Sequence, residues 1–379
     1  MSVKEVNHVS IKGIVTVVPE QVKNVDDEFE VFNNDETQLS RNKKILGMGT
    51  RHVIDDRTTN TDLCFAAALN LIEKLQEDKN SIDALIVVSS SHDYHYPASA
   101  CVIQGMLDLP EECTCFDISG LSCSAYVHGL INAHALISSG CAKKVLLLAG
   151  DTNSTHTDAN NRSHLLFGDA ASATLLEYTE EENTAWFYTS ARGKDYDKLI
   201  APAGGSALPV REDISSLFET DSQGNVWHLW EDCLRGLDVF NFSSEVCPKG
   251  INALLEYSKY SIEDIDYVAL HQVNKPAVNI IGMYAKLPKD KYSFDAFSKY
   301  GNCGSAAVVT EICSHLYERK HDKVMMATFG VGLSCGCCLV DLSKTLIFPV
   351  TVYKTPEGKL NRQEKIAYWT EYYKAGNRG

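Results

Sequence analysis

The chain has 379 residues, of which 44% are hydrophobic and 22% charged, so it can bury a large core and is not a disordered protein. Its formal net charge is −15, which argues against binding to nucleic acid or to an anionic membrane surface. The N-terminus has no apolar stretch typical of a signal peptide, and no window nears 18 uninterrupted apolar residues, so we expect a cytoplasmic protein without a membrane span.

The first elements predicted are a helix and a buried strand. Residues 60–76 repeat apolar side chains at helical spacing, and residues 81–88 form a short, continuously apolar run after a polar turn. A strand without polar alternation is typical of a sheet covered on both faces, as in layered α/β proteins. We therefore expect helices and mostly parallel strands to alternate along the chain.

Two later strands repeat two earlier ones. The segment 265–270 resembles 81–88, and 322–328 resembles 143–150, with offsets of 183 (266 − 83) and 179 (324 − 145) residues. Nearly equal offsets indicate a duplicated α/β unit, although short apolar strands also match by chance.

Cys123 follows a predicted strand at 115–118 and begins a helix that is apolar almost all round and ends at Gly140. Such a helix is buried, and the positive end of its dipole favours the thiolate form of a cysteine there. The alternative is a small core residue, because the chain has 13 cysteines, most of them in apolar runs typical of reduced, buried thiols.

Two residues of the second half are expected near Cys123. Asn302 lies 179 residues further on (302 − 123), at the start of the corresponding helix, although asparagine there is also a common helix cap. His271 follows the strand 265–270, at the end of the sheet where α/β proteins bind ligands, and a histidine can transfer a proton near neutral pH. A structural role is the alternative for each residue taken singly.

A glycine-containing turn follows the strand 322–328. Its residues Gly330, Val331 and Gly332 could direct backbone N–H groups at a ligand and, with the N–H of Cys123, form an oxyanion hole. The same pattern is also common in ordinary turns.

Together these residues resemble β-ketoacyl-acyl carrier protein synthase III, a condensing enzyme of the thiolase fold. The matching motifs run in order from about His8 to Leu342. They are Arg51-His52, Tyr96 to Cys101, the Cys123 turn, Phe167 to Ala170, His271 to Asn274, Gly301-Asn302, and Phe329 to Gly332.

The resemblance implies an α/β, thiolase-like fold with two pseudo-symmetric layered halves in the order αβαβα. We expect an N-terminal half at residues 1–180 with Cys123, and a C-terminal half at 181–342 with His271 and Asn302. Residues 343–379 are expected to form a C-terminal extension, for which a packed arm, a partner surface and a loose terminus remain open.

The resemblance also implies the chemistry. Cys123 takes an acyl group from a thioester. His271 and Asn302 then hold the carbonyl of a malonyl-carrier thioester as it loses CO2, and the enolate attacks the acyl-enzyme to give a β-ketoacyl product. The oxyanion hole falls on the N–H groups of Cys123 and Val331. The substrate-binding residues fall on Asn274, Gly330, Gly332 and, across a homodimer, Tyr96.

No metal or tightly bound cofactor is implied, because substrates arrive as coenzyme A or acyl-carrier thioesters. The expected partners are an acyl-carrier protein, an acyl-CoA, or both, in fatty acid or polyketide biosynthesis. Two positions depart from the family: Arg41 replaces a tryptophan that stacks on the coenzyme A adenine, and Gly49 replaces an arginine. This favours the carrier protein as donor, although a guanidinium can also stack on a base.

Three alternatives were weighed. The first moves the acyl group from Cys123 to an alcohol or amine without forming a carbon–carbon bond. The second is a non-catalytic subunit that pairs with an active homologue. The third is a zinc protein built on Cys335, Cys337 and Cys338, whose spacing is too tight for the usual C-x2–4-C ligand pair.

Overall fold

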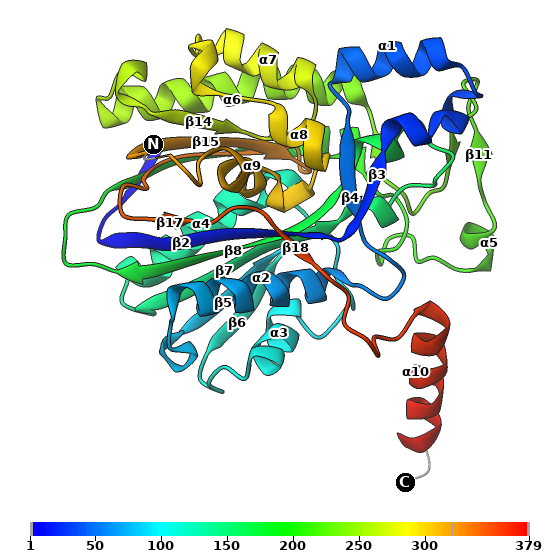
Figure 1. Ribbon diagram of the computed structural model, residues 1–379, viewed down its shortest axis with the longest axis horizontal. Helices are drawn as coiled ribbons and strands as arrows, with labels where there is room; N and C mark the ends of the chain where they lie inside the picture. Colours follow the sequence, from blue (N-terminus) through cyan, green and yellow to red (C-terminus); the bar gives the residue numbers. More distant parts are fainter. Residues whose placement is uncertain (1–2, 320, 377–379) are drawn as a thin grey trace.

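Two sheets form the centre of the computed structural model, which describes residues 3–319 and 321–376 (Figure 1). The N-terminal sheet has the order β17-β2-β8-β7-β5-β6, with β18 also paired to β2, and the C-terminal sheet has the order β1-β9-β16-β15-β14. The strands of the first are β2 (Val9–Pro19), β5 (Ala84–Val88), β6 (Thr114–Ile118), β7 (Lys144–Thr152), β8 (Asp169–Tyr178), β17 (Leu346–Ile347) and β18 (Thr351–Tyr353). Those of the second are β1 (Val3–Val6), β9 (Ala185–Ala191), β14 (Tyr267–Leu270), β15 (Lys323–Gly330) and β16 (Ser334–Asp341).

Helices cover both sheets and fill the space between them. Their bounds are α1 (Glu36–Leu46), α2 (Asn60–Leu75), α3 (Ser99–Leu107), α4 (Ala125–Ser138), α5 (Glu212–Ser215), α6 (Gly236–Ser258), α7 (Lys275–Tyr284), α8 (Asp295–Tyr300), α9 (Ala307–His315) and α10 (Arg362–Gly376). Short paired strands complete the structure: β3 (Gln21–Asn24) with β4 (Thr50–Val53), β10 (Leu199–Ile200) with β13 (Cys233–Leu234), and β11 (Glu219–Thr220) with β12 (Val226–Trp227).

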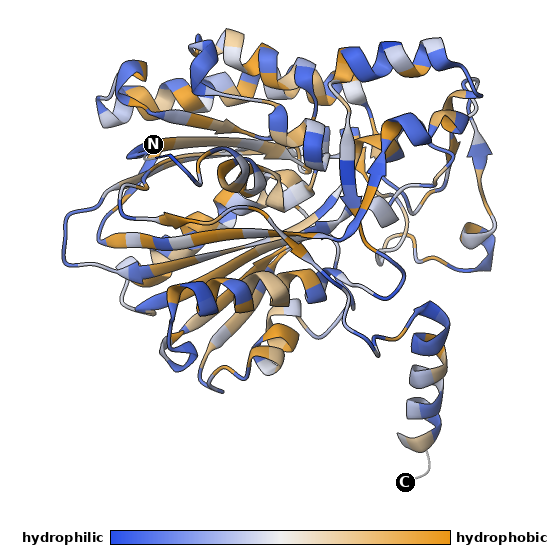
Figure 2. Cartoon of the chain, viewed as in Figure 1, coloured by the Kyte–Doolittle hydropathy of each residue, from blue (hydrophilic) through white to orange (hydrophobic). Residues whose placement is uncertain are grey.

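The layers follow the order αβαβα. Helices α4 and α9 lie between the sheets, and their side chains form one apolar cluster with the inner faces of both. Helices α2 and α3 pack on the outer face of the N-terminal sheet, and α6 and α7 on that of the C-terminal sheet. Figure 2 shows the matching pattern, with apolar strands at the centre and polar faces on the outer helices. The predicted thiolase-like fold class is confirmed.

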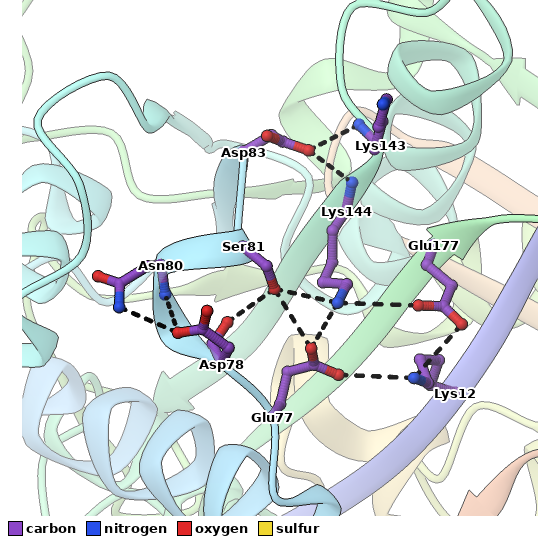
Figure 3. Close-up of polar contacts among 9 residues, drawn as sticks. All are labelled: Lys12, Glu77, Asp78, Asn80, Ser81, Asp83, Lys143, Lys144 and Glu177. Carbon is purple, nitrogen blue, oxygen red and sulfur yellow. Dashed lines mark hydrogen bonds and ion pairs between the residues drawn. The ribbon is translucent and has the colours of Figure 1, made fainter.

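The duplication is visible in a repeated polar contact. At the start of β5, Asp83 Oδ2 accepts the N–H groups of Lys143 and Lys144 at 2.7 and 2.9 Å (Figure 3). Before β14, Asp266 Oδ2 accepts two N–H groups just before and at the start of β15, both at 2.8 Å. In each half the carboxylate thus ties one parallel strand to the next, at the predicted offsets of 183 and 179 residues.

Around the first of these contacts the N-terminal half carries a further charged network. Lys144 pairs with Glu77 and lies 3.8 Å from Glu177, and Lys12 lies 3.6 and 3.4 Å from the same two carboxylates (Figure 3). The network is at the amino end of β7, so it leaves the carboxyl ends of the strands free for a site.

The two halves exchange their terminal strands. The first strand, β1, pairs with β9 in the C-terminal sheet, whereas β17 and β18 pair with β2 in the N-terminal sheet. The expected extension at 343–379 is therefore partly a sheet edge. The division proposed at residue 180 falls between β8 and β9 and remains a prediction, and residues 1–2 and 377–379 lie outside the described residues.

The last helix, α10, projects from the body of the molecule (Figure 1). None of its described residues is buried, although Trp369 contacts Tyr94 edge-on with ring centroids 6.1 Å apart. Its approach is fixed by Lys359, whose ammonium pairs with the buried carboxylate of Asp62. Among the described residues, no helix is both long and apolar enough to cross a bilayer.

Candidate active site

Cys123 lies in the 3-10 turn Ser122–Ser124, between β6 and the buried helix α4. Its sulfur is 3.9 Å from both side-chain polar atoms of Asn302, which comes from the other half. Asn302 is 4% exposed, and its Oδ1 also accepts the N–H of Gly304 at 3.1 Å. The local cap expected as an alternative is therefore present, and it fixes the amide beside the thiol.

The helix pairing behind this contact differs from the one predicted. Helices α4 and α9 begin at Ala125 and Ala307, 182 residues apart (307 − 125), so the counterpart of Cys123 is Ser305 rather than Asn302. Asn302 precedes the second 3-10 turn, Gly304–Ala306, by two residues. The sequence offset of 179 missed this shift, because the loop before α9 is three residues shorter relative to the strand offset than the pairing assumed.

His271 follows β14, as predicted, and points into the same pocket as Cys123 and Asn302. Its backbone N–H donates to the carbonyl of Ala327 at 2.9 Å, and its ring packs edge-on against Phe329 with centroids 5.1 Å apart. The side chain is 1% exposed, and Nδ1 has no hydrogen-bond partner among the described residues.

Burial sets the protonation state of both groups. It lowers the pKa of His271 to about 3, so the imidazole is neutral at neutral pH and can offer one N–H and one lone pair. Burial also raises the pKa of Cys123 to about 12, against the smaller effects of hydrogen bonds from Ser122 and Asn302. The expected preference for thiolate is thus outweighed in the resting site, where the thiol keeps its proton.

The turn after β15 packs directly on the Cys123 turn. A Cβ at Gly330 would lie 2.9 Å from the backbone N of Ser124 and 3.1 Å from that of Cys123, so only glycine permits this approach. The next residue, Val331, lines the pocket beside Cys123, and its carbonyl accepts the hydroxyl of Ser334 at 2.6 Å. The expected oxyanion residues therefore lie side by side.

A cavity of about 560 Å³ surrounds these residues. Of the predicted site residues, it is lined by Cys123, His271, Asn302, Asn274, Gly330 and Val331. Asn274 also caps α7 through its Oδ1, which accepts the N–H of Ala277 at 2.9 Å. Gly332 does not line the cavity, and Tyr96 is 85% exposed on the surface, so this chain by itself does not bring these two residues to the pocket.

The sequence missed the cover of this cavity. The segment 199–240 contributes Trp230, Asp232 and Phe240 to its lining, and His156 contributes from the loop after β7. Burial raises the pKa of the Asp232 carboxyl, and the nearby His156 opposes that shift. The segment has few regular elements and no repeated apolar spacing, so no pattern in it indicated a site.

The alternative zinc site is wrong for the cysteines proposed. Cys335, Cys337 and Cys338 lie in β16, where they are buried. Cys335 and Cys337 face one apolar core, and Cys338 faces the other, so the three thiols cannot converge on an ion.

A cysteine at the start of a central helix, facing an asparagine and a histidine from a pseudo-symmetric half, defines an acyl-transferring enzyme of the thiolase fold. Residues 116–194 match the family described as 3-oxoacyl-[acyl-carrier-protein (ACP)] synthase III, and residues 255–342 match its C-terminal domain. The chain belongs to this family of condensing enzymes, and simple non-condensing transfer is not favoured.

Named relatives agree with that assignment. A putative 3-oxoacyl-[acyl-carrier-protein] synthase 3 from Campylobacter jejuni is 38% identical over 90% of this chain and 96% of its own length. A β-ketoacyl-[acyl-carrier-protein] synthase III from Fusobacterium nucleatum is 30% identical over 88% and 98%. A crystal structure of a 3-oxoacyl-(acyl-carrier protein) synthase from Burkholderia xenovorans is 30% identical, with a TM-score of 0.83 over 93% of this chain and 99% of that one.

Proposed function

We propose that Cys123 carries the acyl group as a thioester and that His271 and Asn302 act on the malonyl thioester of an acyl-carrier protein. The observation that carries this proposal is the 3.9 Å contact between the Cys123 sulfur and the Asn302 amide, in a cavity that His271 also lines. It rests on family membership for the reaction and on this geometry for the residues.

In the first half-reaction the Cys123 sulfur attacks the carbonyl carbon of the donor thioester. The carbonyl oxygen gains negative charge, which the N–H groups of Cys123 and Val331 stabilise. The carbon–sulfur bond to the donor then breaks, and the departing thiolate takes up the proton that Cys123 gives up. His271 is a suitable carrier for that proton, since its neutral imidazole has a free lone pair.

In the second half-reaction the malonyl carbon–carbon bond breaks and CO2 leaves. The negative charge passes to the thioester oxygen, which accepts hydrogen bonds from the Asn302 amide and the His271 N–H. The enolate carbon then attacks the acyl carbon on Cys123, a carbon–carbon bond forms, and the Cys123 thiolate leaves and regains its proton. A neutral donor such as His271 suits this step, because it stabilises the enolate without protonating it.

For the acyl donor we propose a carrier protein in preference to free acyl-CoA. Arg41 lies exposed on α1, where the family resemblance expects an aromatic residue. At Gly49 a Cβ would lie 2.3 Å from the carbonyl oxygen of Ser298, so the arginine expected by resemblance cannot be accommodated on this backbone. Both features weaken recognition of the nucleotide part of coenzyme A.

We further propose a homodimer that acts in the cytoplasm without a tightly bound catalytic cofactor. The exposed ring of Tyr96 is suited to complete the partner's acyl pocket, and the 13 free cysteines suit a reducing compartment. The function is tested by supplying an acyl thioester and malonyl-acyl-carrier protein. We expect CO2 release and a β-ketoacyl product, whereas transfer of the acyl group without CO2 release would reject condensation.

A further inference from the structure

Three potential metal ligands lie together outside the Cys123 site. Asp158 comes from the loop after β7, and His228 and Glu231 come from the segment that covers the cavity. One ligand atom from each residue lies within 4.8 Å of those of the other two. This is the one such group of at least three His, Cys, Asp or Glu side chains found within residues 3–319 and 321–376.

The histidine is oriented as a metal ligand would be. Nδ1 of His228 lies 3.1 Å from the carbonyl oxygen of Leu217, and because a carbonyl can only accept, Nδ1 carries the proton. The lone pair of Nε2 then faces the group, 3.5 Å from Asp158 Oδ2. The ring is further held by stacking on Trp230 at 4.2 Å. Metal-bound histidines usually donate their other N–H to such a carbonyl.

The spacing suits zinc. Nitrogen and oxygen ligands at about 2.1 Å from a tetrahedral Zn²⁺ lie roughly 3.4 Å apart, close to the separation of His228 Nε2 and Asp158 Oδ2. The remaining position of the tetrahedron would be filled by water, as is common when a protein supplies three ligands.

The charge of the group is not balanced by side-chain cations. Glu231 is only 7% exposed, and its Oε2 accepts the backbone N–H of His228 at 3.2 Å. Asp158 Oδ1 accepts the backbone and side-chain N–H groups of Asn160 at 2.8 and 3.0 Å, which leaves Oδ2 toward His228. Within the described part of the chain, neither carboxylate forms an ion pair with a lysine or arginine. Buried carboxylates usually require such a partner or a metal.

We propose that Asp158, His228 and Glu231 bind a structural Zn²⁺ ion. The ion would join the loop after β7, which carries His156, to the covering segment, which carries Trp230. It would therefore hold the cover of the cavity in place and take no part in the condensation chemistry. This site is independent of the proposed function and differs from the absence of metal expected from the family.

The test measures zinc in the full-length protein after incubation with ZnSO4 and gel filtration. We expect one zinc per wild-type chain. Asp158→Asn and Glu231→Gln keep the side-chain shapes and remove the charges, and each should weaken zinc binding by at least about tenfold. Cys233→Ser, at an exposed thiol two residues from Glu231, should bind zinc like the wild type.

A second measurement guards against variants that misfold and against binding to thiols. Co²⁺ bound to the wild type should lack the near-ultraviolet charge-transfer absorption of a cobalt thiolate, and zinc should raise the midpoint of thermal unfolding. A wild type that retains no zinc, variants that retain it equally, or a thiolate absorption would each overturn the proposal. In the first case the group is a hydrogen-bonded pair of a protonated His228 with Asp158.

Discussion

Single residues in this site owe their chemistry to packing more than to residue type. Cys123 and His271 were predicted from their places at a helix start and a strand end, and the structure brings both to one cavity with Asn302. Their protonation states were not predictable in the same way. The sequence shows the helix dipole that favours a thiolate, but not the surrounding protein that raises the Cys123 pKa to about 12.

The two half-reactions should separate on mutation. His271→Ala and Asn302→Ala remove the groups that hold the malonyl carbonyl, so decarboxylation should fall by about 10²-fold or more while self-acylation of Cys123 is largely retained. Quench-flow acylation and release of labelled CO2 measure the two steps. Loss of acylation in both variants with normal decarboxylation would reverse this assignment of roles.

A second histidine predicts how stability depends on pH. Burial lowers the pKa of His134, on α4 and away from the catalytic residues, from 6.5 to about 4, and its ring packs on Phe187. The unfolded chain therefore binds a proton below pH 6.5 that the folded chain does not bind until about pH 4. Stability should be lost as the pH falls through this window.

The contribution of His134 is at most about 3 kcal/mol at pH 4, from the size of the shift. His134→Gln should reduce the loss of unfolding free energy between pH 6.5 and 4, as measured by urea denaturation. The control is His8→Gln, at a histidine on the opposite side of β2 that is exposed. An unchanged slope in His134→Gln would show that other groups cause the acid sensitivity.

At the scale of elements, strands and helices with continuous or periodic apolar residues were predictable. The helix expected at 60–76 is α2 at Asn60–Leu75, and the four repeated strands are β5, β7, β14 and β15. Contacts between distant segments were not predictable, because they depend on the assembled sheets. These include the exchange of β1 with β17 and β18, and the cover over the cavity, whose order comes from contacts rather than local spacing.

The duplicated carboxylate contacts should contribute equally in the two halves. Asp83→Ala and Asp266→Ala each remove two hydrogen bonds from backbone N–H groups to a carboxylate, and each should lower the unfolding free energy by about 1–2 kcal/mol. The effects should add in the double variant, since the sites share no partner. Asp322→Ala, which keeps the N–H that Asp266 accepts, is the control and should change stability little.

At the scale of the whole molecule, the acidic chain must bind substrates that are themselves anionic. We expect acylation by a carrier-bound acyl group to be faster than acylation by the same group on coenzyme A. Arg41→Trp should then improve the coenzyme A reaction by about tenfold, because base stacking on an aromatic ring contributes roughly 1–3 kcal/mol, without changing the carrier reaction. Equal rates with both donors in the wild type would contradict the preference.

The central claim is that Cys123 holds the acyl group, and the mass of the intact protein tests it most directly. After incubation with a panel of acyl thioesters, the wild type should gain the mass of one acyl group, and digestion should locate it on the peptide that contains Cys123. Cys123→Ala should gain none, whereas Cys141→Ala, which removes an exposed thiol, should be acylated like the wild type. An adduct that persists on Cys123→Ala would contradict the account.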